Sequence, residues 1–237
     1  MRLSWLAPFL AAAALLLLLL SGPTVRLGLW DFETGFRLLR WAAYLGLASM
    51  AAALAALLTR TGRRTILLQV AALLIGGGVA YVPWHWLQLA RRVPPIHDIS
   101  TDLEHPPEFV AVLPLRAGAP NPAVYGGPEV ASAQRAGYPD LTSLVVHRPP
   151  GPTFARALAS ARAMGWTLVA ADSSAGRIEA TATTPWFGFK DDVVIRVAPD
   201  PAGSRVDVRS VSRVGGSDVG TNARRIRAYL ARLAAGG

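Results

Sequence analysis

A nine-residue segment concentrates side chains that could bind a metal ion. It runs from His97 to His105 and holds five side chains of metal-binding type. On an extended strand alternate residues share a face, so Asp98 and Asp102 would lie on one side with Ser100 between them. Two carboxylates and a hydroxyl can hold a hard cation. The alternative, which we favour, is a strand and turn whose Asp and Thr side chains satisfy local backbone groups. We therefore expect no metal or other cofactor, and the weak metal candidates are His97, Asp98 and Asp102.

A glycine-rich loop leads into a helix near the end of the chain and could bind an anion. The segment runs from Ser210 to Asn222 and is followed closely by Arg225. Free backbone N–H groups at the start of a helix favour a negatively charged group. The alternative is a tight loop in which Thr221 or Asn222 caps the helix and Asp218 pairs with an arginine. The loop has neither the spacing nor the lysine of a Walker loop.

Paired acids at Asp191 and Asp192 could act as general acid and base. Adjacent residues on a strand face opposite ways, so the two carboxylates could act together only at a bulge. No nucleophile elbow, zincin motif or EF-hand loop occurs, so no catalytic residue is assigned and we expect a protein that is not an enzyme. A site is plausible only where distant polar residues meet in one cleft. The candidates are His97, Asp98, Thr101, Asp102, Asp191, Asp192, Arg209, Ser210, Ser212, Arg213, Asp218, Asn222 and Arg225.

The charge of the chain is unevenly distributed along its 237 residues. The net charge is +9, but residues 1–95 hold nine arginines against Asp31 and Glu33, which gives +7. Residues 96–237 hold 15 basic and 13 acidic residues, which gives +2. The basic excess therefore belongs to the apolar part of the chain and indicates anchoring at a lipid surface, not a nucleic-acid groove. The absence of cysteine excludes disulfides, thiolate nucleophiles and Cys-based zinc sites.

Three long apolar runs indicate that residues 1–95 form a transmembrane region. The runs are Leu3–Leu20, Trp41–Leu58 and Ile66–Leu89, and a span needs about 20 apolar residues. We expect spans at about 3–20, 38–58 and 66–89. The first run is predicted to be an uncleaved anchor, with a signal peptide as the alternative. Gly76-Gly77-Gly78 either lets another helix approach closely or is a weak point in a lipid-packed helix.

The orientation of the spans rests on the short loop Thr59–Thr65, which holds three arginines and no acid. Total arginine counts on the two sides, four against five, do not decide it. The dense loop favours the inside of the membrane under the positive-inside rule. An N-terminus inside and three spans then place the C-terminal part outside. We therefore expect a multi-pass protein of the inner (cytoplasmic) membrane with a periplasmic domain.

Residues 96–237 are predicted to form a soluble α+β domain. Residues 96–150 are rich in proline and glycine and are expected to be extended chain without a long regular element. Beyond them the periodicity predicts an antiparallel sheet with helices packed on one face. The alternation at 205–211 would point Val206 and Val208 inward and Arg205, Asp207 and Arg209 outward. The expected helices are one that begins at Pro152 and ends before Gly165, which follows its C-cap, and one at about Thr221–Leu233. The expected strands are Trp166–Ala170, Arg177–Thr183, Asp192–Ala198 and Arg205–Val211.

The same segments resemble a largely bacterial family, the domain of unknown function fourteen-ninety-nine. The resemblance begins at His97-Asp98-Ile99-Ser100-Thr101-Asp102 and continues to about residue 233. It is strongest at Thr184-Pro185-Trp186-Phe187-Gly188-Phe189-Lys190-Asp191-Asp192 and at Val206-Asp207-Val208-Arg209-Ser210 with the loop that follows. It implies a small domain, often exported or membrane-tethered, with no established activity. The three apolar runs lie outside it.

Two functional hypotheses follow from the sequence. The first is a membrane-anchored module in the bacterial cell envelope that binds or scaffolds, with the lipid bilayer and either an envelope protein or an anionic ligand as partners. The second is a metal-assisted hydrolase of an envelope component that uses His97 with Asp98 or Asp102. The two differ in bound metal, because the hydrolase requires a metal ion and the binding module does not.

Overall fold

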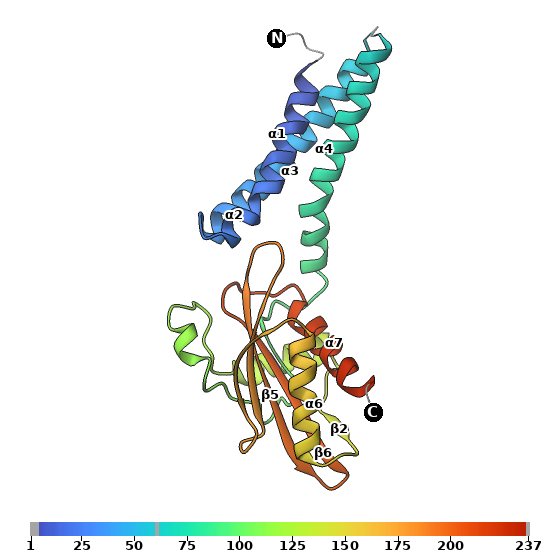
Figure 1. Cartoon of the computed structure of the whole chain (residues 1–237). Coiled ribbons are helices and arrows are strands. Elements are labelled where there is room, and N and C mark those ends of the chain that lie inside the picture. The colour runs from blue at the N-terminus through green and yellow to red at the C-terminus, as the bar shows by residue number, and fades with distance from the viewer. Residues whose placement is uncertain (1–4, 60–61, 236–237) are drawn as a thin grey trace. The chain divides into compact units, whose positions relative to one another are not determined.

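The structure is a computed structural model that describes residues 5–59 and 62–235 (Figure 1). The chain divides into two compact units. The first comprises Met1–Leu89 together with the loop Pro185–Gly188, and the second comprises Ala90–Thr184 and Phe189–Gly237.

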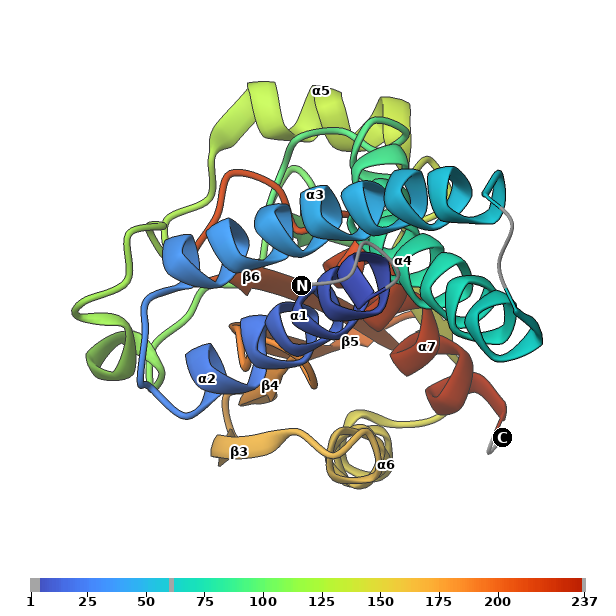
Figure 2. The same cartoon turned by 90° about the horizontal axis from the view of Figure 1, so that it is seen from above.

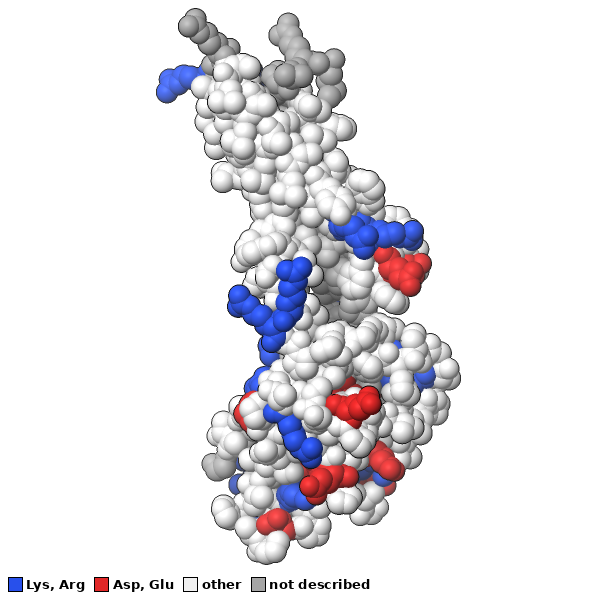
Figure 3. Space-filling view, turned by 180° about the vertical axis from the view of Figure 1, so that it is seen from behind, with Lys and Arg blue, Asp and Glu red and all other residues white. Residues whose placement is uncertain are grey.

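Three helices of the first unit are long and apolar enough to cross a membrane, as predicted. They are α1 (Leu6–Ser21), which the short α2 (Pro23–Arg26) extends, α3 (Phe32–Leu57) and α4 (Arg63–Ala90). With 26 residues in α3 and 28 in α4, each exceeds the length that about 30 Å of hydrocarbon requires. On the face seen in Figure 3, charged side chains lie only near the ends of these helices. The chain is therefore a membrane protein.

Close backbone contact between two glycines holds α3 against α4. A Cβ atom added to Gly46 would lie 2.6 Å from the carbonyl oxygen of Gly76, and the reverse distance is also 2.6 Å. Beside this crossing the buried hydroxyl of Ser49 lies 2.9 Å from the carbonyl oxygen of Ala7 and 3.4 Å from that of Ala72. Small residues and interhelical hydrogen bonds stabilise helix association where no hydrophobic effect operates between helices. Of the two interpretations of the glycine run, close helix approach is the one found at Gly76.

A bulky side chain at this crossing should separate the helices. We expect Gly76→Leu to cost about 2 kcal/mol of overpacking strain and to lower the melting temperature of the full chain in a neutral detergent by about 6 °C. Gly78→Leu is the matched control, because no atom lies within 4 Å of a Cβ added there. Equal melting temperatures for the two variants would show that the crossing does not stabilise the bundle.

The second unit is built on a six-stranded antiparallel sheet, which confirms the predicted α+β class (Figure 1). The strand order is β1-β6-β5-β4-β3, and β2 pairs with β6 beside β1. Strand β4 has the bounds predicted for it, whereas β5 and β6 extend beyond the predicted ends. The strands are β1 (Asp98–Ser100), β2 (Leu144–Val146), β3 (Thr167–Asp172), β4 (Arg177–Thr183), β5 (Lys190–Asp200) and β6 (Gly203–Ser212).

One face of the sheet packs against α6 (Pro150–Ala163) and α7 (Thr221–Ala235). Inward-pointing residues of the strands form the core there with Ala157 and Ile226. The Tyr229 ring of α7 stacks on Trp166 at 5.2 Å between centroids, and its hydroxyl donates to the Ala157 carbonyl oxygen at 3.0 Å. Figure 2 shows both helices on the same side of the strands.

The prediction of no long regular element in residues 96–150 is wrong at one place. Helix α5 (Gly127–Gly137) forms there, and β1 and β2 add two strands of three residues each. The helix carries few apolar residues, so its periodicity is weak. It is held by the buried Gln134 amide, which accepts from the Ser100 N–H at 2.9 Å and donates to the Ser100 carbonyl oxygen at 2.6 Å.

The opposite face of the sheet is covered by residues 102–126, which we call the strap. Its only helical element is the 3-10 helix η2 (Leu113–Arg116). Figure 2 shows the green chain of the strap on the side of the strands away from α6 and α7. The prediction that Asp207 and Arg209 face outward is therefore wrong, since their exposures are 0% and 2%. The alternation of β6 was predicted correctly, but its polar side faces the strap instead of solvent.

Candidate functional site

The register of the sheet sorts the candidate residues into two groups. Asp191 and Asp192 pair with Ser212 and Val211 without a bulge, so their carboxylates point to opposite faces and cannot act together. One group, Asp98, Asp192, Arg209 and Arg213, lies under the strap, and Asp102 is the first residue of the strap itself. The other lies on the side of α7: Asp191, Ser210, Ser212, Asn222 and Arg225.

Arg209 and Asp98 form a buried ion pair under the strap. Arg209 Nε donates to Asp98 Oδ1 at 2.9 Å and Nη2 to Oδ2 at 2.7 Å. The guanidinium lies over the rings of Phe109 and Tyr125, 5.2 and 5.3 Å from their centroids. Its remaining donors reach the carbonyl oxygens of Pro107 and Ala123 in the strap. Burial raises the pKa of Asp98, and the bonds from Arg209 oppose that shift.

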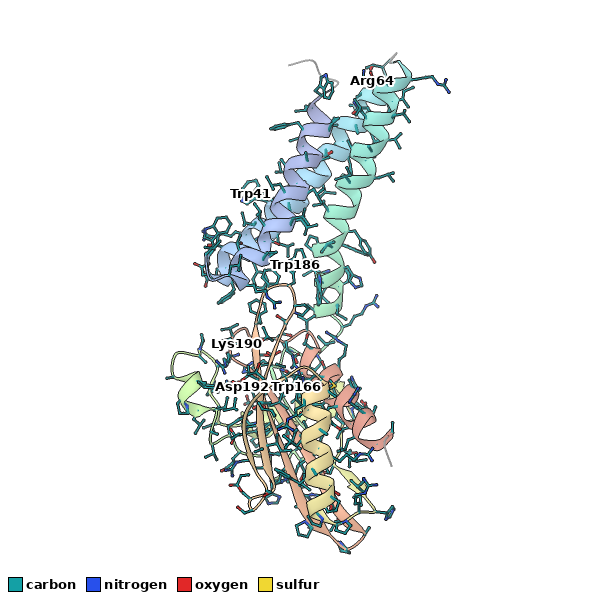
Figure 4. The ribbon with its side chains drawn as sticks, in the orientation of Figure 1. Trp41, Arg64, Trp166, Trp186, Lys190 and Asp192 are labelled. Atoms are coloured by element: carbon teal, nitrogen blue, oxygen red, sulfur yellow. The ribbon has the colours of Figure 1, made fainter. Side chains whose placement is uncertain are left out.

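Asp192, which is labelled in Figure 4, is fully buried in the second unit. It binds two arginines. Arg213 donates from Nε and Nη2 to its two carboxylate oxygens at 2.8 Å, and Arg116 of the strap donates to Oδ2 at 2.6 Å. Thr181 donates to Oδ1 at 2.7 Å. Burial alone would raise the pKa of Asp192, but the bonds from Arg213, Thr181 and Arg116 outweigh it and lower the pKa below its usual value.

Glu179 binds the backbone of the strap, a role that sequence reasoning missed. Its two carboxylate oxygens accept from the N–H groups of Val110, Ala111 and Val112 at 2.9 to 3.1 Å, and Oε1 also accepts from Arg177 Nε at 3.1 Å. The side chain is fully buried. The sequence did contain a signal for this role, since Glu179 is an acidic residue flanked by two core residues in the strand β4.

A second polar cluster lies on the side of α7. Arg225 Nη2 donates to Asp191 Oδ2 at 2.5 Å, and its Nη1 donates to Ser210 Oγ at 3.1 Å and to the Asn222 side-chain oxygen. Asn222 Nδ2 in turn donates to Ser212 Oγ at 3.0 Å and to the backbone oxygen of His97 at 2.9 Å. This cluster ties α7 to β5, β6 and the chain before β1.

The start of α7 is occupied by the carboxylate of Asp218. Its Oδ1 accepts from the Gly220 N–H at 2.8 Å and its Oδ2 from the Asn222 N–H at 2.6 Å. Burial raises the pKa of Asp218 despite these bonds. The sequence-based alternative paired Asp218 with an arginine, whereas the carboxylate caps the helix. The N–H groups expected to attract an external anion are thus bound within the chain.

The His97–His105 segment does not gather into a metal site. Thr101 Oγ1 accepts from the Val208 N–H at 2.9 Å. Asp102 accepts from two strap N–H groups and from Nη2 of Arg196 and Arg205, at 2.9 and 2.8 Å. Burial raises the pKa of Asp102, but these bonds and charges lower it overall. Within residues 5–59 and 62–235, no three His, Asp or Glu side chains lie close enough together to hold a metal ion.

The second unit matches a known protein family. The family described as "Protein of unknown function (DUF1499)" matches residues 98–233, from β1 to α7, which is more than half of the chain. The chain belongs to the DUF1499 family. A search of curated proteins found no match. The three membrane helices lie N-terminal to the DUF1499 module.

Two cavities open on the surface of the DUF1499 module. The smaller, of about 380 Å³, includes Thr101, Ser143 and Arg205 in its lining. These residues lie where β1 and β2 separate along the edge of β6. The larger, of about 470 Å³, lies between the first residues of the strap and strands β4 and β5, over Arg177 and Arg196.

The network around Asp192 should make the stability of the module depend on pH. Because its pKa is lowered on folding, Asp192 contributes stability above its unfolded pKa of about 3.9 and loses it as the pH falls through the lower folded value. Asp192→Asn leaves Arg116 and Arg213 without their carboxylate and should cost about 3 kcal/mol at pH 7.

Urea unfolding of the full chain in neutral detergent at pH 7 and pH 2.5 measures this difference. We expect the gap between wild type and Asp192→Asn to shrink clearly at pH 2.5. Glu108→Gln is the control, since Glu108 is exposed. A gap that stays constant with pH would contradict the lowered pKa.

Proposed function

We propose that this chain is a non-enzymatic protein of the bacterial inner membrane whose three helices anchor a periplasmic binding or scaffolding module. The observation that carries the proposal is the mutual neutralisation of the candidate residues. Asp98 is bound by Arg209, Asp191 by Arg225, and Asp192 by Arg116 and Arg213. These pairs stabilise a fixed scaffold, and the surface remains available for an envelope protein or an anionic ligand.

The chemistry of the paired carboxylates argues against a hydrolase. A general base must accept a proton from its substrate, and a metal ligand must offer a free lone pair. Asp98 and Asp102, the carboxylates of the hydrolase hypothesis, each accept hydrogen bonds on their oxygens from arginine or backbone donors. A metal ion there would have to displace those arginines, and a cation beside several guanidinium groups is electrostatically unfavourable.

The proposed location depends on the orientation of the spans. The arginine-rich loop between α3 and α4 favours the cytoplasm. Three spans then carry the module to the opposite side.

Reporter fusions after residue 237 test the orientation. We expect alkaline phosphatase, which needs an oxidising compartment, to be active there, and a reporter that functions only in the cytoplasm to be inactive. Fusions in the Thr59–Thr65 loop should give the opposite pattern and serve as the control. An active cytoplasmic reporter after residue 237 would overturn the periplasmic location.

Metal analysis separates the binding module from the hydrolase. We expect the purified chain to contain less than about one-tenth of an equivalent of any divalent metal and its melting temperature to be unchanged by Zn²⁺, Mn²⁺ or Mg²⁺. The reason is that no group of three ligands gathers among the residues that the structure describes. Stoichiometric metal that is lost in a His97→Ala/Asp102→Asn variant would contradict the proposal and favour the hydrolase.

A further inference from the structure

The larger surface cavity has a pair of like charges on its floor. Arg177 of β4 and Arg196 of β5 are direct cross-strand partners, so their side chains share one face of the sheet, and both line the cavity. Like charges in such a position repel each other and normally weaken a sheet. Their side chains are 30% and 29% exposed, so both guanidinium groups reach solvent.

Buried carboxylates hold both arginines in place. Arg177 Nε donates to Glu179 Oε1 at 3.1 Å, and Arg196 donates from Nε and Nη2 to Asp207 Oδ2 at 3.2 and 2.8 Å. Glu179 and Asp207 are fully buried. The guanidinium groups are therefore oriented before any ligand arrives, which lowers the entropic cost of binding.

Each arginine retains donors that the module does not use. In the described part of the chain, Nη1 of Arg177 and Nη1 of Arg196 make no hydrogen bond, whereas the other nitrogens of Arg196 are bound to Asp102 and Asp207. Two neighbouring guanidinium groups with free N–H donors match the oxygens of a phosphate or carboxylate. Their charges are balanced by the buried acids, so recognition would come from oriented donors.

The opposite wall of the cavity is acidic. The strap contributes Glu104 and Glu108, which are exposed, and among the described residues their carboxylates make no hydrogen bond or ion pair. Pro106 and Pro107 lie between them and stiffen this wall. A second negative charge on a ligand would meet these acids, whereas an ammonium group would be attracted to them.

We propose that this cavity binds a small zwitterion whose phosphate or carboxylate lies on Arg177 and Arg196 and whose ammonium group faces Glu104 and Glu108. The volume of about 470 Å³ is within the range of small-molecule sites. The side chain of Val110, which also lines the cavity and is exposed, offers apolar surface to the carbon atoms that join the two charges. The inference rests on the proposed binding function and names its ligand class. Phosphoethanolamine, free or as a lipid headgroup, has this chemistry.

Calorimetric titration of the full chain in a neutral detergent tests the site with phosphoethanolamine, inorganic phosphate and ethanolamine. We expect phosphoethanolamine to bind about tenfold more tightly than phosphate, and ethanolamine not to bind measurably. Arg196→Gln should weaken binding of both phosphates about tenfold or more. Arg162→Gln, an exposed change of equal charge on α6, should leave both affinities unchanged.

The double variant Glu104→Gln/Glu108→Gln tests the acidic wall. Both residues are exposed, so the variant should fold normally, which circular dichroism and the melting temperature verify. We expect the preference for phosphoethanolamine over phosphate to disappear while phosphate affinity does not fall. An unchanged preference, or an Arg196→Gln variant that binds like Arg162→Gln, would overturn the proposal.

The source of the ligand is distinguished by phosphatidylethanolamine in mixed micelles. Stronger protection against thermal unfolding by the lipid than by soluble phosphoethanolamine identifies a headgroup, and the reverse identifies a free ligand. Either result supports the site if the Arg196→Gln substitution removes the protection against thermal unfolding. Binding of neither overturns the site. The periplasmic location and the absence of bound metal would still be tested independently, by the reporter fusions and the metal analysis.

Discussion

The module depends on one constraint: the backbone N–H and C=O groups of the strap need hydrogen-bond partners. Residues 102–126 cover one face of the sheet, yet apart from the short η2 they form no helix or strand, so their N–H and C=O groups lack regular partners. Buried backbone groups must be satisfied, because an unmade hydrogen bond costs about 1–3 kcal/mol each. The sheet supplies the missing partners from side chains. That requirement explains why charged residues occupy positions on the strap side of the sheet, where an ordinary hydrophobic core would contain valine.

Two arginines under the strap therefore have two roles each. Arg209 neutralises Asp98 and also binds the carbonyl oxygens of Pro107 and Ala123. Arg213 neutralises Asp192 and also binds the carbonyl oxygen of Leu115 at 2.8 Å. Buried ion pairs are often no more stable than apolar replacements of similar volume. Apolar side chains could not hold this strap, however, because they offer no donors to its carbonyl oxygens.

Much of the fold can be predicted from the sequence. The predictions that were wrong or missed share one cause, which is contact between residues far apart in the chain. The three spans and β4 follow from local periodicity, which depends on a residue and its neighbours. The outward prediction for Asp207 and Arg209 failed because alternation shows which residues share a face, and it does not show what covers that face. Glu179 was overlooked for the same reason, since its three N–H partners lie about 70 residues earlier in the chain. Helix α5 was missed because a Gln134–Ser100 pairing holds it and its apolar pattern is weak.

The number of guanidinium nitrogens that donate hydrogen bonds within the module distinguishes structural arginines from those that can bind a ligand. Arg209 is 2% exposed, and its Nε, Nη1 and Nη2 atoms all donate within the module, so substitution there tests folding. Arg196 has an equally fixed position, but its Nη1 makes no hydrogen bond to any described residue, and its side chain lines a cavity. Composition and charge cannot distinguish the two, since both are arginines on alternating strands. The distinction arises from burial under the strap. Arg209 is 2% exposed there, whereas the Arg196 side chain is 29% exposed and lines the cavity between the strap and the sheet. The segment that stabilises the module therefore also lines the proposed site.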